Sequence, residues 1–254
     1  MTVSFETQIA EAEREPFSGW NFSYITNRYR QEHVSWDYRA IVLERMKKAE
    51  SMLDMGTGGG EFLGSLQPLP KVTYATEAYA PNVPIARKRL EPLDVKVMGI
   101  ISDGNLPFAN ETFDLIINRH EEYSGKEVYR ILKHRGAFLT QQVGDRNNLE
   151  LNELLEKKLH GTINLSYPNW NLAIATQELP SVGFEILDEK EEFPKGVFLD
   201  IGAVVFYLKA IPWNIQDFDV GRYRKQLAEL HELIQANGKL DVTSHRFYVE
   251  ASKR

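Results

Sequence analysis

The stretch that most constrains the fold of this chain runs from Ser51 to Leu66, SMLDMGTGGGEFLGSL. A short apolar run ends at Asp54, a glycine-rich turn covers residues 56–60, and an apolar helical pattern begins at Glu61. This order predicts a strand, a turn and a helix. Glycine has no Cβ, so the turn can take positive φ angles and let a ligand approach the backbone, where the helix start presents free N–H groups. The stretch therefore predicts a ligand site.

Two nucleotide-binding motifs do not fit this stretch. A P-loop needs Gly, four residues and then Gly-Lys-Ser/Thr, and the sequence has no such string. The dinucleotide fingerprint needs Gly-x-Gly-x-x-Gly. Its third glycine position falls on Glu61 when counted from Gly56, and on Leu63 when counted from Gly58. Asp54 would also repel a pyrophosphate, so the acid at the strand end favours a cationic ligand.

The string LDMGTGGGEFL, residues 53–63, resembles motif I of the class I S-adenosylmethionine-dependent methyltransferases, here of a small-molecule, type 11-like kind. In that family the turn holds the methionine part of the cofactor, which carries an ammonium group and no phosphate. The resemblance implies S-adenosylmethionine as cofactor and S-adenosylhomocysteine as product. It places these residues at the cofactor: Asp54, Gly56, Thr57, Gly58 and Gly60. The alternative is a glycine-rich loop without a ligand.

Two later strings extend the resemblance. Val72–Glu77 reads as a second strand that ends in an acid, and in the family this acid binds the ribose hydroxyls. The segment from Asp103 to Phe108, followed by Phe-Asp and an apolar strand, resembles the turn that holds adenine in the family. By this resemblance Asp103 accepts a hydrogen bond from the adenine amino group, and the N–H of Gly104 faces a ring nitrogen. The alternative for this segment is a turn without a ligand.

A third match lies at Arg130–Gly136, RILKHRG, where the family has Arg-x-Leu-Lys-Pro-Gly-Gly before a strand. The proline and the first glycine are replaced, but the register is kept. The matches occur in the family's order and cover residues 52–143. Beyond them only a looser similarity to uncharacterised methyltransferases is found, at Trp170–Ala173 and His245–Phe247.

The fourth strand ends at Ile117-Asn118-Arg119-His120-Glu121. In the family this end faces the methyl group of the cofactor, so Asn118 is expected at the cofactor and, with Gln142, in the polar lining. His120 is the candidate base, because an unperturbed histidine pKa lies near about 6.5. Glu121 either orients His120 or binds the acceptor. The alternative is that His120 packs structurally and the acceptor ionises unaided.

The alternation of strands and helices predicts an α/β fold, a Rossmann-like, seven-stranded and mostly parallel sheet with helices on both faces. We expect one structural domain. Residues 1–50 would form a helical segment whose aromatic stretch, Phe17–Trp36, closes as a lid, unless it is only core packing. Residues 51–254 would form the methyltransferase core, with a helical insertion at about 195–238 before the last strand. Leu199–Ala210 fits a helix or a buried strand.

The composition of the chain argues against several classes of binding partner. With 36 acidic and 30 basic residues the net charge is −6, which argues against nucleic acid. The chain has no cysteine and no histidine pair at ligand spacing, so no metal site is expected. The first sixteen residues do not read as a signal peptide, and the longest apolar run, Ile201–Leu208, is too short for a membrane span. We expect a cytoplasmic protein without a membrane partner.

The sequence therefore predicts an enzyme that transfers the methyl group of S-adenosylmethionine to an unidentified small-molecule acceptor. The alternatives are a non-catalytic regulator or scaffold that binds the same cofactor, and an RNA methyltransferase. Redox chemistry with a nicotinamide cofactor is disfavoured by Glu61 at the third glycine position. The oligomeric state is left open.

Overall fold

The computed structural model describes residues 3–18 and 20–254, and they form two compact units. The first unit comprises the described residues up to Val34 together with Gly144–Trp170 and Glu192–Arg246. The second unit comprises Ser35–Val143, Asn171–Glu191 and Phe247–Arg254. All residues that the sequence assigns to the cofactor site lie in the second unit.

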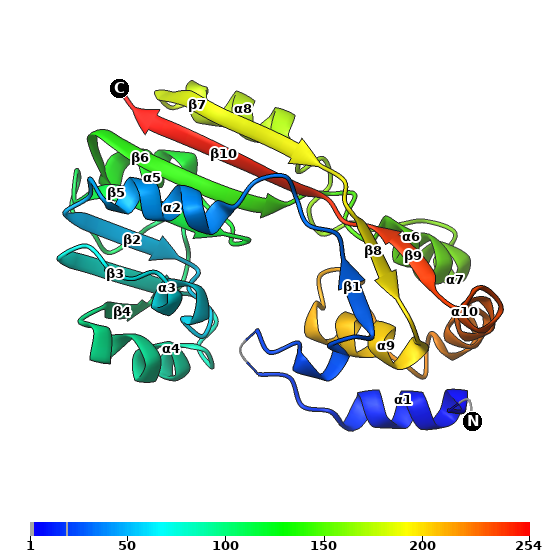
Figure 1. The fold of residues 1–254 in the computed structure, drawn as a ribbon. Helices are drawn as coiled ribbons and strands as arrows, with labels where there is room; N and C mark the ends of the chain where they lie inside the picture. The colour runs from blue at the N-terminus through cyan, green and yellow to red at the C-terminus, as the bar shows by residue number, and fades with distance from the viewer. Residues whose placement is uncertain (1–2, 19) are drawn as a thin grey trace. The chain divides into compact units, whose positions relative to one another are not determined.

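The second unit is built on a seven-stranded sheet with the strand order β4-β3-β2-β5-β6-β10-β7. The pairs from β4 to β6 are parallel, and Figure 1 shows β10 running opposite to β6 and β7. This is the predicted fold, and the sequence expectation is confirmed. The strands are β2 (Ser51–Met55), β3 (Val72–Glu77), β4 (Lys96–Gly99), β5 (Phe113–Arg119), β6 (Leu132–Val143), β7 (Phe184–Glu192) and β10 (Arg246–Lys253).

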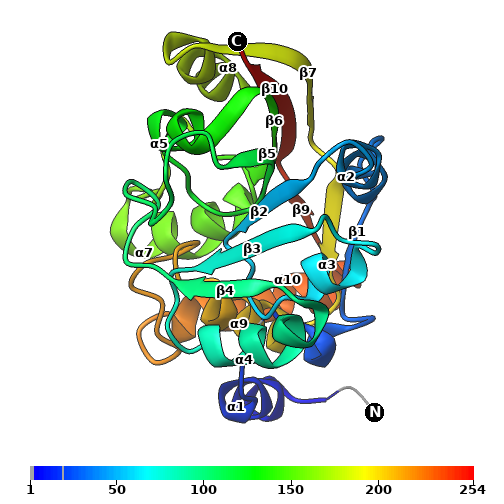
Figure 2. The same cartoon turned by 90° about the vertical axis from the view of Figure 1, so that its left-hand side faces the viewer.

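Helices cover both faces of this sheet, and Figure 2 shows α2 and α3 on one side and α5 and α8 on the other. Short polar side chains start two of them: Asp37 accepts a hydrogen bond from the N–H of Ala40 at 3.0 Å, and Ser124 accepts one from Glu127 at 3.4 Å. The helices are α2 (Tyr38–Met46), α3 (Glu61–Ser65), α4 (Val83–Leu90), a 3₁₀ helix (Glu91–Leu93), α5 (Gly125–Ile131) and α8 (Leu172–Ser181).

The first unit has its own hydrophobic core around α9 (Ile201–Ala210), in which eight of ten residues are buried. The segment that fitted a helix or a buried strand is thus a helix. A three-stranded antiparallel sheet, in the order β1-β8-β9, packs with it. The other elements are α1 (Phe5–Arg14), a 3₁₀ helix (Ser23–Ile25), β1 (Tyr29–Gln31), α6 (Leu149–Leu151), a π-helix (Asn152–Lys157), α7 (Lys158–His160), β8 (Lys195–Phe198), α10 (Arg224–Asn237) and β9 (Leu240–Thr243).

Two segments differ from their predicted form. Residues 241–249, expected as one last strand, contribute to two strands, β9 and β10, which belong to different sheets. Trp36, expected at the end of a lid, is only 6% exposed and packs against Tyr248 within the second unit. The expectation of a single structural domain stays a prediction.

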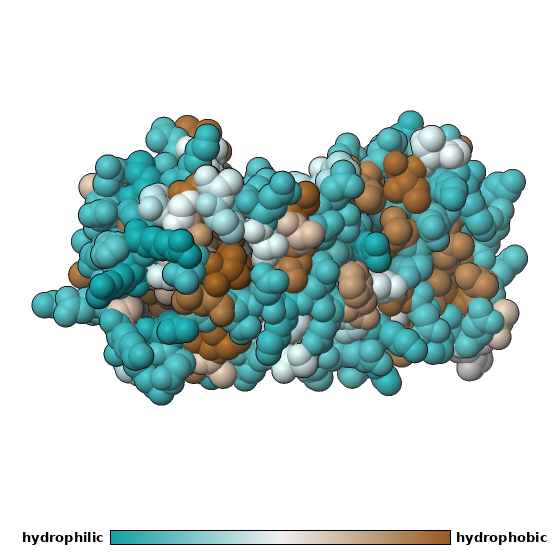
Figure 3. All heavy atoms as spheres, turned by 90° about the horizontal axis from the view of Figure 1, so that it is seen from above, coloured by the Kyte–Doolittle hydropathy of each residue, from teal (hydrophilic) through white to brown (hydrophobic). Residues whose placement is uncertain are grey.

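The exposed surface is mixed. On the face seen in Figure 3, hydrophilic side chains predominate and hydrophobic ones gather in separate patches. Within the part of the chain that the structure describes, no helix has both the length and the hydrophobicity needed to cross a membrane.

Candidate active site

The predicted site residues meet at the carboxyl ends of β2, β3 and β5. The parallel register sets Asp54 beside Ala75 of β3 and beside Ile117 of β5. The N–H of Thr57 then donates to the carbonyl oxygen of Thr76 at 2.9 Å, which ties the glycine turn to the end of β3. Because parallel strands end at the same edge of a sheet, three segments that are distant in sequence form one site here.

The glycine turn leaves room that another side chain fills. Gly56 has φ +65° and Gly60 has φ +80°, a region that favours glycine. A Cβ placed on Gly56 would lie only 2.6 Å from Oε2 of Glu121. The carboxylate of Glu121, which follows β5, therefore lies directly over the motif I turn.

Glu77, the acid that ends β3, is only 4% exposed and holds the same turn. Its Oε2 accepts a hydrogen bond from the N–H of Gly58 at 2.6 Å, and its Oε1 accepts one from Tyr79 at 2.7 Å. Burial raises the pKa of Glu77 above its ordinary value. Glu77 is thus placed where the sequence predicts the ribose ligand, and it is held there by backbone N–H groups.

Asp54 is almost completely buried at the end of β2, with 3% of its surface exposed. Burial raises the pKa of its carboxyl to about 7. An acid whose charged form is so poorly solvated would gain from a cationic group placed beside it.

The predicted adenine turn follows β4. Burial, with the charges of Glu122 and Glu77, raises the pKa of Asp103 to about 6. The Oδ1 atom of Asp103 is buried and has no hydrogen-bond partner, so it can accept one from a ligand. The N–H of Gly104 already donates to Oγ of Ser102 at 3.1 Å. The structure thus leaves a buried hydrogen-bond acceptor at Asp103, whereas the N–H of Gly104 is already bonded to Ser102.

Glu121 is the fourth acid at this edge. Burial, with the charges of Asp103, Glu77 and Glu122, raises the pKa of Glu121 to about 7. A carboxyl with a pKa near neutrality can hold a cation in its charged form, and it can also exchange a proton with a substrate.

Asn118 and Gln142 hold the backbone of the segment after β5. Asn118 is fully buried, and its Oδ1 accepts a hydrogen bond from Nε2 of Gln142 at 2.7 Å and from Oγ1 of Thr140 at 3.2 Å. The same Nε2 donates to the carbonyl oxygen of Glu121 at 2.9 Å. Asn118 and Gln142, which the sequence placed in the polar lining, thus hold the backbone of Glu121 through this hydrogen-bond network.

His120 lies at the exposed end of β5 and is held by Gln141. Its backbone N–H donates to the carbonyl oxygen of Gln141 at 2.8 Å, and its Nε2 lies 3.2 Å from Nε2 of that side chain. Oε1 of Gln141 accepts a hydrogen bond from the indole N–H of Trp36 at 2.8 Å. Sequence reasoning did not select Gln141. The signal was present as two successive glutamines near the carboxyl end of β6.

The chemistry of this edge fits S-adenosylmethionine. Asp54, Glu77, Asp103 and Glu121 surround the glycine turn, and the side chain of Glu121 fills the space beside Gly56. A ligand with an ammonium and a sulfonium group would stabilise these carboxylates, whereas a pyrophosphate would be repelled. Among the residues that the structure describes, no group of three or more histidine, aspartate or glutamate side chains could hold a metal ion.

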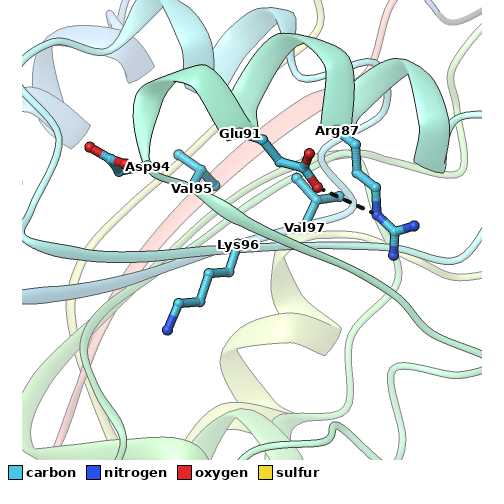
Figure 4. A pocket seen from close by; sticks show the side chains of 6 residues that line it. All are labelled: Arg87, Glu91, Asp94, Val95, Lys96 and Val97. Atoms are coloured by element: carbon cyan, nitrogen blue, oxygen red, sulfur yellow. Dashed lines mark ion pairs between the residues drawn. The ribbon is translucent and has the colours of Figure 1, made fainter.

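A surface hollow of about 460 Å³ lies elsewhere, at the amino end of β4. Its only ion pair joins Arg87 and Glu91 at 3.8 Å, and Lys96 points away from that pair (Figure 4). The lining residues are Arg87, Glu91, Asp94, Val95, Lys96 and Val97. None of them belongs to the motifs, and the hollow lacks the convergent carboxylates that mark the carboxyl ends of the strands.

Comparison with known proteins identifies the type of domain. Residues 53–140 match the sequence model of a family described as "Methyltransferase domain". The match runs from within β2 to within β6 and includes the predicted cofactor residues, His120 and Glu121, but not Gln142. A search of curated proteins found no relative that matches this sequence.

Solved structures share the fold at low sequence identity. A proposed methyltransferase from Bacillus halodurans is 17% identical with a TM-score of 0.59, and the match covers 83% of this chain and 98% of that chain. Phosphoethanolamine N-methyltransferase 2 from Haemonchus contortus, solved with phosphomonomethylethanolamine and S-adenosylhomocysteine, is 16% identical with a TM-score of 0.52, covering 86% of this chain and 52% of that chain. The [4+2]-cyclase SpnF is 15% identical with a TM-score of 0.55, covering 85% and 79%.

At these identities the structural likeness shows the fold alone. A protein described as a cyclase shares this fold, so the fold by itself does not identify the reaction. The match to the family over residues 53–140 supplies the activity. Residues 53–140 therefore match a methyltransferase domain, which implies S-adenosylmethionine as the cofactor.

Proposed function

We propose that this enzyme methylates a small-molecule acceptor at the carboxyl ends of β2 to β5. The observation that carries the proposal is the convergence of Asp54, Glu77, Asp103 and Glu121 on the glycine turn. The residues proposed to bind the cofactor are Asp54, Gly56, Thr57, Gly58, Gly60, Glu77, Asp103, Gly104 and Asn118.

Each part of this set has a separate task. When bound, S-adenosylmethionine supplies a methyl group that a lone pair on the acceptor can attack. The glycine turn lets the ligand approach the backbone, and Asp103 offers a buried acceptor to the adenine amino group. The negative field of the four acids favours a cationic ligand. Alignment of the acceptor and exclusion of water are then the main contributions of the protein.

His120 and Glu121 are the proposed catalytic residues, because they follow β5 at the edge where the cofactor binds. An O–H or N–H acceptor must release a proton at some stage. The Glu121 carboxylate can receive it, since burial and neighbouring acids raise its pKa to about 7. His120 is the second candidate for this task.

A small molecule suits this site better than a nucleic acid. The net charge of the chain is −6, and the predicted site itself gathers four acids, so a polyanion would be repelled twice. A neutral or cationic acceptor carries no such penalty.

Calorimetry tests the proposed cofactor site directly. We expect wild-type protein to bind S-adenosylmethionine and S-adenosylhomocysteine one to one, and Gly58→Ala to lose this binding. Gly58 has φ +60°, so a side chain there strains the turn and fills the space beside the backbone.

Gly238→Ala is the matched control. Gly238 also has a positive φ, +71°, and a Cβ there meets nothing within 4 Å. It should lose a similar amount of stability but keep full binding. If wild-type protein gives no heat with millimolar ligand, or if both variants lose binding alike, the proposed site is wrong.

A further inference from the structure

A hydrogen-bonded chain of three side chains, Trp36, Gln141 and His120, lies within the second unit. Trp36 is 6% exposed and Gln141 is 9% exposed. The indole N–H of Trp36 donates to Oε1 of Gln141 at 2.8 Å, and Nε2 of Gln141 lies 3.2 Å from Nε2 of His120. The first two members are buried and the third reaches the exposed end of β5, so the chain connects the core to the proposed site.

Donor and acceptor chemistry fixes the direction of every bond in this chain. An indole N–H can only donate, so it must face the oxygen of the Gln141 amide. The NH₂ group of Gln141 then faces His120, and an amide NH₂ can only donate as well. Nε2 of His120 must therefore accept, which means that it carries no proton. In a neutral imidazole the proton then resides on Nδ1.

The backbone of His120 is constrained by the same neighbour. Its N–H donates to the carbonyl oxygen of Gln141 at 2.8 Å, and its φ angle of +65° lies in the left-handed region, which is uncommon for residues other than glycine. Strained backbone of this kind persists only where surrounding contacts hold it, and it clusters at functional sites. Gln141 thus contacts both the backbone and the ring of His120.

We infer that Trp36 and Gln141 are positioning residues that hold His120 as the neutral Nδ1–H tautomer, so that His120 is a hydrogen-bond donor and Glu121 is the base. This inference rests on the proposed function, and it reverses the roles that the sequence suggested for the two residues. Protonating Nε2 would set two N–H donors against each other and break the bond to Gln141.

The proton balance of the step follows. The acceptor X–H would give its proton to a carboxylate oxygen of Glu121, forming an O–H bond, while the electron pair of the X–H bond stays on X. That pair would form the new X–C bond to the methyl carbon as the C–S bond breaks, and the electrons of the C–S bond would stay on the sulfur of the leaving S-adenosylhomocysteine. Glu121 later returns the proton to water. The position of Glu121 suits this task, because its carboxylate lies over Gly56 of the glycine turn. Its charged neighbours, Asp103, Glu77 and Glu122, make the neutral form easy to reach.

Nitrogen NMR of the histidine rings tests the inference without a known acceptor. The full-length protein is labelled with ¹⁵N-histidine, and the signals of His120, one of six histidines, are assigned by comparison with His120→Asn. At neutral pH we expect His120 to show a protonated Nδ1 and an unprotonated Nε2. A proton found on Nε2 overturns the inference.

Two variants then test the positioning residues. Gln141→Glu places a carboxylate, which can only accept, against His120, so the proton should move from Nδ1 to Nε2. Trp36→Phe keeps an aromatic ring beside Tyr248 but removes the indole N–H, so the Gln141 amide can turn over and a mixture of both tautomers should appear. The matched control is Gln235→Glu, which adds the same charge on the exposed face of α10 and should leave His120 unchanged.

The outcomes separate this inference from the proposed function. If the wild-type tautomer is Nδ1–H but neither Gln141→Glu nor Trp36→Phe alters it, the ring is set by other contacts and the inference is overturned. If the protein binds S-adenosylmethionine by calorimetry but shows Nε2–H, only the inference fails. If the tautomers behave as expected but no cofactor binds, the proposed function fails instead.

Discussion

At the residue scale, the acids of the site are held in an environment that disfavours their charge. Glu121 shows this most clearly, because burial and three neighbouring acids, Asp103, Glu77 and Glu122, all raise its pKa. Such groups destabilise the folded protein in the absence of a cation and become useful when one binds. The site therefore lowers the stability of the folded protein when no cation is bound.

Stability should consequently fall as pH rises through the neutral range. A carboxyl whose folded-state pKa is raised from 4.5 to about 7 binds more protons in the folded than in the unfolded protein between those values. Its contribution is complete below the unfolded pKa and is lost as pH rises to about 7. We expect Glu121→Gln, measured by urea unfolding without ligand, to be more stable than wild type at pH 8, by on the order of 1–3 kcal/mol, and to show less pH dependence.

Glu232→Gln provides the control for this experiment. Glu232 lies on the exposed part of α10, so its replacement should change stability little at any pH. Equal stabilities of Glu121→Gln and wild type at pH 8 would show that the charged carboxylate of Glu121 does not destabilise the folded protein.

The sequence could predict the acids of the site but not the contacts between them. Asp54 and Glu77 lie at the ends of β2 and β3, Asp103 lies in the turn after β4, and a local motif marks each of them. The bond between Gln141 and Trp36 joins residues 105 positions apart, and no local pattern encodes it. The tautomer that we infer for His120 depends on that distant contact, so sequence reasoning could not predict it.

At the element scale, strands and amphipathic helices were predicted well where one face is buried. β3 begins and ends as expected, at Val72 and Glu77. α9 gave no such signal. It is buried on nearly every side, so its residues are apolar all round and the helical period disappears from the sequence. The expected strand over residues 241–249 merged β9 and β10, because only Ser244 and His245 separate them and neither glycine nor proline marks the break.

The start of α9 offers a test at this scale. Asp200 caps the helix by accepting a hydrogen bond from the N–H of Ala203 at 2.9 Å, and it also accepts two from Arg28, at 2.6 and 2.8 Å. Asp200→Ala removes the cap and leaves the half-buried guanidinium of Arg28 unpaired. Urea unfolding should show a loss of roughly 2–4 kcal/mol.

Asp241→Ala serves as the comparison for that loss. Asp241 pairs with Lys239 at 2.8 Å, but both side chains are about half exposed, so this ion pair should contribute less than about 1 kcal/mol. If the two substitutions cost the same, Asp200 does not anchor α9 in the way its contacts suggest.

At the scale of the whole molecule, the sequence predicted the methyltransferase sheet but not the second core. The seven-stranded sheet follows from the order of its strands and the family motifs. The first unit is assembled from the N-terminal segment, residues 144–170 and residues 192–246. These pieces carry no common motif, and only tertiary contacts join them.

The net charge leads to a prediction for the intact protein. Because the chain carries −6 and the proposed site is acidic, we expect no salt-sensitive binding to tRNA or ribosomal RNA at micromolar concentrations. Filter binding at low and high salt measures this. Micromolar affinity that falls steeply with salt would assign the enzyme to RNA methylation instead.

The central claim is that S-adenosylmethionine binds at the carboxyl ends of β2 to β5. Backbone NMR during titration with the cofactor tests this claim most directly, since it reports binding and its location together. We predict saturable shifts centred on residues 56–60, Glu77, residues 103–104 and residues 118–121, with little change around the hollow at Arg87 and Lys96. The absence of shifts, or shifts centred on that hollow, would contradict the account.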